Sequence, residues 1–173
     1  MAKTDTTVVC DAGPVIHLDE LGCLFLLKDF SRVIMPSGVR DEVLTHRNLD
    51  FGSVDISWSV VSEPFTTDKH VLTMCRMFFL DLGETEAIGV ISNHPDAILL
   101  TDDAAARLVA SKLGFRVHGT IGVLLRAIRR QLLKAEDVID ILNALPVSST
   151  LHIKQSLLDE VTSQVKKECR KKP

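Results

Sequence analysis

Carboxylates follow two predicted buried strands at the point where each strand ends. Asp11 comes directly after residues 6–10 (TTVVC), a β-branched run that is typical of a buried strand. Asp102 and Asp103 come after the apolar run at residues 97–101 (AILLT). In open α/β sheets the carboxyl ends of the strands form the edge at which ligands usually bind. We therefore expect these carboxylates to lie close together.

Two further carboxylates fall near the beginning of predicted helices. Glu42 lies in the first or second turn of a helix predicted at residues 38–47, and Glu84 begins a helix predicted at residues 84–91. Acidic side chains are favoured at helix N-termini by capping and by the helix dipole. Taken by themselves, these carboxylates fit both a shared metal site and a set of helix caps.

When several carboxylates lie close together, the repulsion between their negative charges must be offset. Like charges within a few Å of each other raise one another's pKa values unless a cation lies between them. Mg²⁺ and Mn²⁺ are hard ions that favour oxygen ligands. Such an ion lowers the pKa of a water and neutralises charge that develops on a phosphate, which suits hydrolysis of phosphodiester bonds.

The elements that carry these positions alternate between strands and helices. The predicted strands are residues 6–10, 32–35, 56–61, 97–101 and 115–117, and helices are predicted after Pro14, at 24–27, 38–47, after Asp68, and at 84–91, 104–113, 121–130, 134–145 and 152–171. Pro14 is expected at the first helical position, Ser37 as an N-cap, and Thr66 and Asp68 as further caps. This alternation with short links predicts an α/β fold with a parallel sheet covered on both faces.

Composition limits the class of protein. A chain of 173 residues forms one domain of ordinary size, and it contains no apolar run of about 18 residues that would span a membrane. The four cysteines, Cys10, Cys23, Cys75 and Cys169, are scattered and form no C-x-x-C pair, which is typical of reduced thiols. We therefore expect a cytoplasmic protein that makes no membrane contact.

The sequence gives little support to other kinds of catalytic or ligand-binding site. The six histidines have no zinc-binding spacing, and the chain has no G-x-S-x-G, Walker or G-x-G-x-x-G motif. The net charge of −3 gives no overall attraction to nucleic acid. Arg107, Arg126, Arg129 and Arg130 are candidate phosphate contacts, although solvent-exposed arginines are the more common case.

Four segments resemble, in order, the successive motifs of PIN-domain nucleases. They are residues 8–16 (VVCDAGPVI), 36–43 (PSGVRDEV), 82–88 (LGETEAI) and 99–107 (LLTDDAAAR). Residues 119–124 (GTIGVL) resemble a segment of a VapC-related branch of that family. The resemblance covers about residues 6–130. Each motif alone is weak evidence for this family, but the four motifs in this order and at this spacing are fairly specific for it.

The resemblance implies a three-layer α/β/α domain with a central parallel sheet and a ribonuclease that depends on Mg²⁺ or Mn²⁺. In that family the acid that ends the first strand and the acid of the early helix are metal ligands, and Asp11 and Glu42 match them. Glu84 matches the third acid. Asp102 and Asp103 both match the last motif, and the choice between them stays open.

This chain departs from the family pattern at two places. Ala12 and Gly13 stand where many members carry a hydroxyl residue after the first Asp, so a hydrogen bond to Asp11 is in question. Glu84 stands where many members have Asp, and Glu86 is a rival two residues further along the same helix. These departures favour an alternative, a catalytically degenerate PIN fold that serves as a binding or interaction module.

The resemblance also implies partners. Members are often toxins of toxin–antitoxin pairs that are inhibited by a small antitoxin and are commonly dimeric, so we expect an RNA substrate, a possible small antitoxin and a homodimer. We assign residues 1–145 to the nuclease domain. Residues 146–173 form a C-terminal helix with a basic tail, which either belongs to the same unit or contacts a second copy or a partner.

Overall fold

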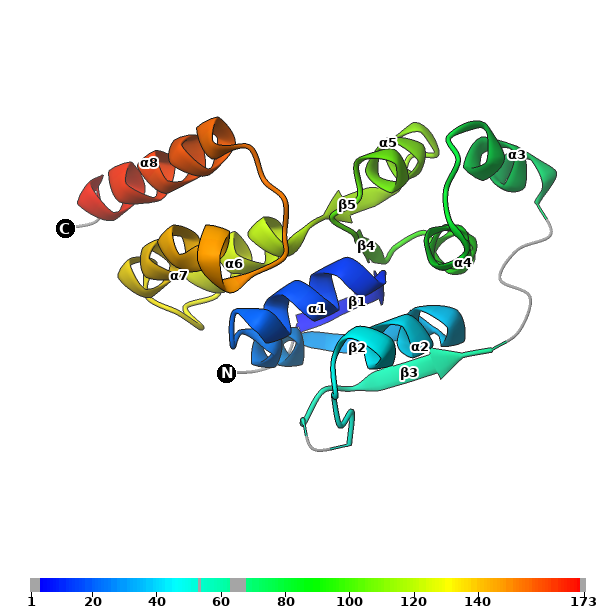
Figure 1. The fold of residues 1–173 in the computed structure, drawn as a ribbon, viewed down its shortest axis with the longest axis horizontal. Coiled ribbons are helices and arrows are strands. Elements are labelled where there is room, and N and C mark those ends of the chain that lie inside the picture. Colours follow the sequence, from blue (N-terminus) through cyan, green and yellow to red (C-terminus); the bar gives the residue numbers. More distant parts are fainter. Residues whose placement is uncertain (1–3, 53, 63–67, 172–173) are drawn as a thin grey trace.

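A sheet of five parallel strands forms the centre of the molecule, in the order β3-β2-β1-β4-β5 (Figure 1). The computed structural model describes residues 4–52, 54–62 and 68–171, with side chains to residue 167. The strands are β1 (Thr4–Cys10), β2 (Phe30–Pro36), β3 (Trp58–Val61), β4 (Ile98–Leu100) and β5 (Arg116–His118). Helices cover both faces, so the predicted three-layer α/β/α fold is confirmed.

Both faces of the sheet are buried because successive strand residues point in opposite directions. In β1, Val8 and Cys10 belong to one core and Val9 to the other. In β4, Leu100 belongs to the first core and Leu99 to the second. The strands are therefore apolar on both sides, as is usual in parallel sheets.

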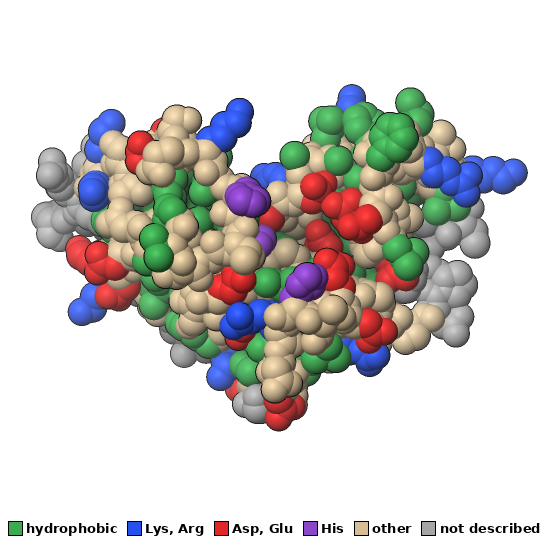
Figure 2. All heavy atoms as spheres, in the orientation of Figure 1, with side chains coloured by type: hydrophobic (Ala, Val, Ile, Leu, Met, Phe, Trp, Pro, Cys, Tyr) green, Lys and Arg blue, Asp and Glu red, His purple; other side chains and the backbone are tan. Residues whose placement is uncertain are grey.

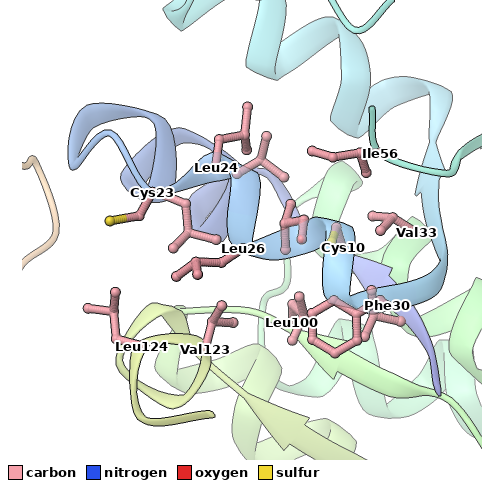
Figure 3. Packing of buried hydrophobic residues seen from close by; sticks show 14 of the residues in the cluster. Cys10, Cys23, Leu24, Leu26, Phe30, Val33, Ile56, Leu100, Val123 and Leu124 are labelled. Atoms are coloured by element: carbon pink, nitrogen blue, oxygen red, sulfur yellow. The ribbon is translucent and has the colours of Figure 1, made fainter. Parts of the chain in front are cut away.

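Two sets of helices fill the outer layers. The first core contains residues of α1 (Ala12–Glu20), the 3₁₀ helix η1 (Leu24–Asp29), α2 (Ser37–His46), α6 (Thr120–Arg129), α7 (Ala135–Ser148) and α8 (Gln155–Lys171). Figure 3 shows β-strand residues of this core packed against side chains of η1 and α6. The second core contains residues of α3 (Lys69–Met77), α4 (Leu82–Ser92) and α5 (Ala104–Lys112). Within the described ranges, no helix combines the length and apolarity needed to cross a bilayer.

The starts of helices α1 and α2 differ from those predicted. Asp11 is the N-cap of α1, which puts Pro14 at the third helical position rather than the first. Ser37 is the first residue of α2 and not its cap, since Pro36 occupies that position. Asp68 caps α3 as predicted. The expected cap Thr66, together with Cys169 and the end of the basic tail, lies outside the residues whose side chains are described.

The chain reverses its direction of strand addition between β1 and β4. It first adds β2 and β3 on one side of β1, then β4 and β5 on the other. Backbone hydrogen bonds join the ends of these strands, from Asp11 N–H to the Leu100 carbonyl (2.9 Å) and from Thr101 N–H to the His118 carbonyl (2.9 Å). Such a switch point leaves a crevice beyond the carboxyl ends of the strands.

Candidate active site

A cleft of about 310 Å³ lies at this switch point and is lined by all five predicted carboxylates. The acids are Asp11, Glu42, Glu84, Asp102 and Asp103, and Asp81, Gly13, His17 and residues 150–152 complete the lining. Figure 2 shows acidic side chains and imidazoles gathered around a hollow in this face of the molecule. Segments that lie far apart in the sequence thus contribute carboxylates to one cleft.

Asp11 lies deepest among these acids, with 7% of its surface exposed. Its Oδ1 accepts a hydrogen bond from Ala12 N–H (2.8 Å), and its Oδ2 accepts one from the Thr101 hydroxyl (2.7 Å). Burial raises the pKa of Asp11 to about 6, and the charges of Glu42 and Asp81 act in the same direction against these two hydrogen bonds. The two hydrogen bonds therefore hold the Asp11 carboxylate in place, but neither donor carries a positive charge that would offset its negative charge.

Thr101 connects two of the acidic segments. It is fully buried, and its Oγ1 accepts a hydrogen bond from Asp103 N–H (3.2 Å) while it donates to Asp11. Position 12 offers Asp11 no hydroxyl, since it is Ala12, but Thr101 supplies one from the end of β4. The departure at Ala12 thus does not deprive Asp11 of a hydroxyl partner.

Glu84 serves as a helix cap and also lines the cleft. Its Oε2 accepts a hydrogen bond from Asp81 N–H (2.9 Å), and Asp81 Oδ1 accepts one from Glu84 N–H (2.8 Å), which together form a capping box. Burial raises the pKa of Glu84 to about 7, with further contributions from Asp103, Asp81 and Asp11. The same capping box explains why α4 begins at Leu82 and not at the predicted Glu84.

Glu42 reaches the cleft from the surface of α2. Its carboxylate lies beside Gly83, where a Cβ atom would be 3.2 Å from Glu42 Oε2. Partial burial and the nearby charge of Asp81 raise the pKa of Glu42. Glu86, the rival of Glu84, does not line the cleft; its carboxylate lies against Gly38 at the start of α2.

Asp102 and Asp103 both line the cleft but have different hydrogen-bond partners. Asp103 caps α5 by accepting a hydrogen bond from Ala106 N–H (2.8 Å), and its charge acts on Glu84. Asp102 instead accepts hydrogen bonds from the Thr120 backbone N–H (2.8 Å) and hydroxyl (2.6 Å), and it pairs with His17 Nδ1 (2.8 Å). Asp103 is therefore the neighbour of Glu84, whereas Asp102 belongs to a network with α1 and α6.

The donor set of the cleft suits a hard divalent cation. All five predicted acids offer oxygen atoms. Burial, together with the charges of neighbouring acids, raises the pKa values of Asp11, Glu42 and Glu84, and a cation would stabilise their charged forms. Hydrogen bonds within the protein hold most of these carboxylates. Among residues 4–52, 54–62 and 68–171, no three Asp, Glu, His or Cys side chains are already placed to hold a metal ion.

Comparison with known proteins decides the family. A family model described as a PIN domain matches residues 7–167. The chain belongs to the PIN-domain family. PIN domains are generally metal-dependent nucleases, so the acidic cleft is where the family's chemistry is expected. The match extends beyond the resemblance seen in the sequence and includes α7 and most of α8. No curated protein matches the chain.

Several residues that line the cleft of this PIN domain were not predicted from the sequence. Asp81 could have been found, because Asp81 and Glu84 have the spacing of a capping box. No motif around His17 marks it as a site residue. Its imidazole pairs with Asp102, which is 85 positions away in the sequence. Residues 150–152 reach the cleft from the link between α7 and α8 and have no motif that would predict this.

That link is held in place by Glu20 at the end of α1. Its carboxylate accepts hydrogen bonds from the Ser149 hydroxyl (2.8 Å), Thr150 N–H (2.8 Å) and the Thr150 hydroxyl (3.0 Å). Although partial burial acts in the opposite direction, these hydrogen bonds lower the pKa of Glu20. We call residues 149–154 the C-terminal strap, because it crosses from α7 to α8 and forms one wall of the cleft.

Proposed function

We propose that this PIN domain is an endoribonuclease that depends on Mg²⁺ or Mn²⁺ and acts as the toxin of a toxin–antitoxin pair. The observation that carries the proposal is the convergence of five carboxylates on one cleft at the β1–β4 switch point. The raised pKa values of Asp11 and Glu84 support it, because carboxyl groups whose pKa values are raised by burial and by neighbouring acids are common at functional sites. When bound, the ion would lower the pKa of a water and neutralise charge on the scissile phosphate.

The residues of the cleft would have different roles in the reaction. Asp11, Glu42, Glu84 and Asp103 would hold the cation, and Asp102 is the further candidate ligand. Thr101 keeps the Asp11 carboxylate in one orientation through its hydroxyl. Residues 150–152 of the strap would form one wall beside the bound substrate.

The partners follow from the same proposal. The substrate is RNA, and the toxin role rests on the resemblance of residues 119–124 to the VapC-related branch. A small antitoxin and a second copy of this chain are the expected protein partners. The cytoplasm, the compartment that the scattered cysteines indicate, contains both the RNA and the antitoxin.

Asp11→Asn tests the proposal. The change removes the charge but keeps the shape, so an Asn oxygen can still accept from Ala12 N–H, and the fold should persist. We expect Mn²⁺-stimulated cleavage of RNA to fall by about 100-fold or more, whereas Asp5→Asn, at the exposed start of the same strand, should cleave normally. Full Mn²⁺-dependent cleavage by Asp11→Asn would contradict the assignment.

A second candidate function is a binding module that has lost catalysis. It is favoured by the hydrogen bonds that occupy the carboxylates and by the lack of three placed ligands among the described residues. Thermal unfolding with and without Mn²⁺ separates the two candidates. An ion present at about 100 times its Kd stabilises the folded state by about 2.7 kcal/mol, whereas an unchanged unfolding temperature at millimolar Mn²⁺ favours the module.

A further inference from the structure

A second pocket, of about 320 Å³, adjoins the acidic cleft. Asp102, Leu151 and His152 line both, so the two hollows share a wall made by the end of β4 and the C-terminal strap. The rest of this second pocket comes from α5, the end of β5, α6 and α8. We call it the flanking pocket, because a chain that crosses the cleft can continue directly into it.

The flanking pocket differs from the cleft in having an arginine and an imidazole beside the shared Asp102. Arg107 and His118 line it, and Arg107 Nη1 donates a hydrogen bond to the Thr101 carbonyl (3.2 Å), which places the guanidinium beside the end of β4. Partial burial, Arg129 and Arg107 lower the pKa of His118, as expected in a positive field. Arg126 and Arg130 are committed elsewhere, because both pair with the buried Asp29. Arg107 is the arginine that lines this pocket and can meet a phosphate there.

The opposite wall of the flanking pocket is aliphatic. Ile121 of α6, Ile153 of the strap, and Leu157 and Val161 of α8 line it. A volume near 300 Å³ is at the lower end of small-ligand sites and is enough for about one nucleotide. Glu20 anchors the strap, so the wall that Ile153 contributes is preformed.

We propose that the flanking pocket binds one unpaired nucleotide of the RNA next to the scissile phosphate. The base packs against the aliphatic wall, and the phosphate lies at Arg107 and His118. This inference rests on the proposed ribonuclease function, and it adds that the RNA must be single-stranded at this position. A base that is stacked and paired in an A-form helix cannot enter such a pocket.

The test compares two leucines of similar exposure. Leu157 is 49% exposed in the flanking pocket, and Leu44 is 43% exposed on α2, away from both hollows. Binding of a fluorescent, unstructured RNA oligonucleotide is measured in EDTA, where metal-dependent cleavage stops. We expect Leu157→Glu to bind about tenfold more weakly, which is roughly what one base contact contributes, and Leu44→Glu to bind normally. A preformed RNA duplex should bind more weakly than the single strand.

A second pair of variants covers the case in which Leu157→Glu fails to fold. Arg107→Gln and Arg40→Gln each remove one exposed positive charge, but only Arg107 lies in the flanking pocket. Arg107→Gln should weaken single-strand binding and reduce its salt dependence by about one phosphate contact. Binding that equals that of the unchanged protein in both Leu157→Glu and Arg107→Gln overturns the inference, as does equal affinity for duplex and single strand.

The cleavage assay with Mn²⁺ separates this inference from the proposed function. Selective single-strand binding that depends on Leu157 and Arg107, without any cleavage, supports the pocket and overturns the nuclease. Cleavage that proceeds equally well in Leu157→Glu and Arg107→Gln supports the nuclease and overturns the pocket. Binding of an apolar peptide that leaves RNA binding unchanged assigns the pocket to a protein partner and overturns the RNA proposal.

Discussion

A buried carboxylate destabilises a protein when it is charged and lacks a positive partner. Asp11 is in this position, since its two hydrogen-bond donors are neutral and its neighbours Glu42 and Asp81 are acids. Its pKa is raised to about 6, whereas an Asp in an unfolded chain titrates at about 4. In that interval the folded state binds more protons than the unfolded state, so its stability decreases as the pH rises.

The metal-free protein should therefore be more stable at about pH 5 than at about pH 8. Between these two pH values the raised pKa of Asp11 alone accounts for about 1.4 kcal/mol of unfolding free energy, and Glu84, with a pKa of about 7, acts in the same direction. Urea unfolding in EDTA at several pH values measures the effect. Asp11→Asn should flatten the pH dependence and be more stable than the unchanged protein at about pH 8. A stability that rises with pH over this interval would contradict the expected electrostatics.

At the scale of elements, the acids of the cleft are both helix caps and site residues. Asp11 caps α1, Asp81 caps α4 and Asp103 caps α5. A helix that follows a parallel strand begins at the carboxyl edge of the sheet, so its cap also faces the crevice there. The two interpretations that the sequence left open are thus compatible. The positive ends of these helices also stabilise the negative charge of the cleft.

That Asp11 would meet Asp102 and Asp103 could be predicted, because the ends of parallel strands share one edge. Glu42 and Glu84 were expected beside them only from the resemblance to PIN domains. The choice between Glu84 and Glu86 required the structure, since it depends on how α4 packs against α2. The prediction of Ser37 as an N-cap was wrong for a related reason. Helix α2 has no side-chain cap, and the carboxylate of Glu86 from α4 lies against its first turn. Local sequence patterns do not contain such contacts between distant elements.

The C-terminal strap gives a test at this scale. Glu20→Ala removes the acceptor for Ser149 and Thr150, so the strap should loosen while the sheet is unchanged. We expect the Thr150 amide to exchange its hydrogen faster and KM for RNA to rise more than kcat falls. Glu20→Gln keeps one carbonyl acceptor and should restore part of the protection. Asp140→Ala, an exposed acid on α7, is the matched control. Unchanged exchange at Thr150 would show that Glu20 does not hold the strap.

At the scale of the molecule, the strand order places two unlike hollows side by side. The ends of β1 and β4 form the acidic cleft, and the ends of β4 and β5 contribute to the flanking pocket, which Arg107 also lines. The alternation of strands and helices predicted a parallel sheet but not this order, because many pairings of five strands satisfy the same pattern. The contribution of the strap to both hollows was also beyond prediction, since 129 positions separate Glu20 from Ser149.

The predicted homodimer can be tested at the turn between α3 and α4. Met77, Phe79 and Leu82 are 65%, 93% and 73% exposed, and Figure 2 shows apolar side chains exposed over α5. Phe79 also has a positive φ of 55°, which is unfavourable for a bulky residue and is tolerated better by Asn. A second copy that covers this turn would explain why an aromatic residue stands there.

Phe79→Asn should therefore separate association from folding. It removes apolar surface from the turn and also relieves the backbone, so the variant should be monomeric and unfold at a temperature no lower than that of the isolated monomer. Val147→Asn, which changes a 92% exposed side chain on α7, should leave a dimer intact. Sedimentation velocity over a range of concentrations measures both. If the unchanged chain is monomeric throughout, or if Phe79→Asn remains dimeric, this turn is not the interface.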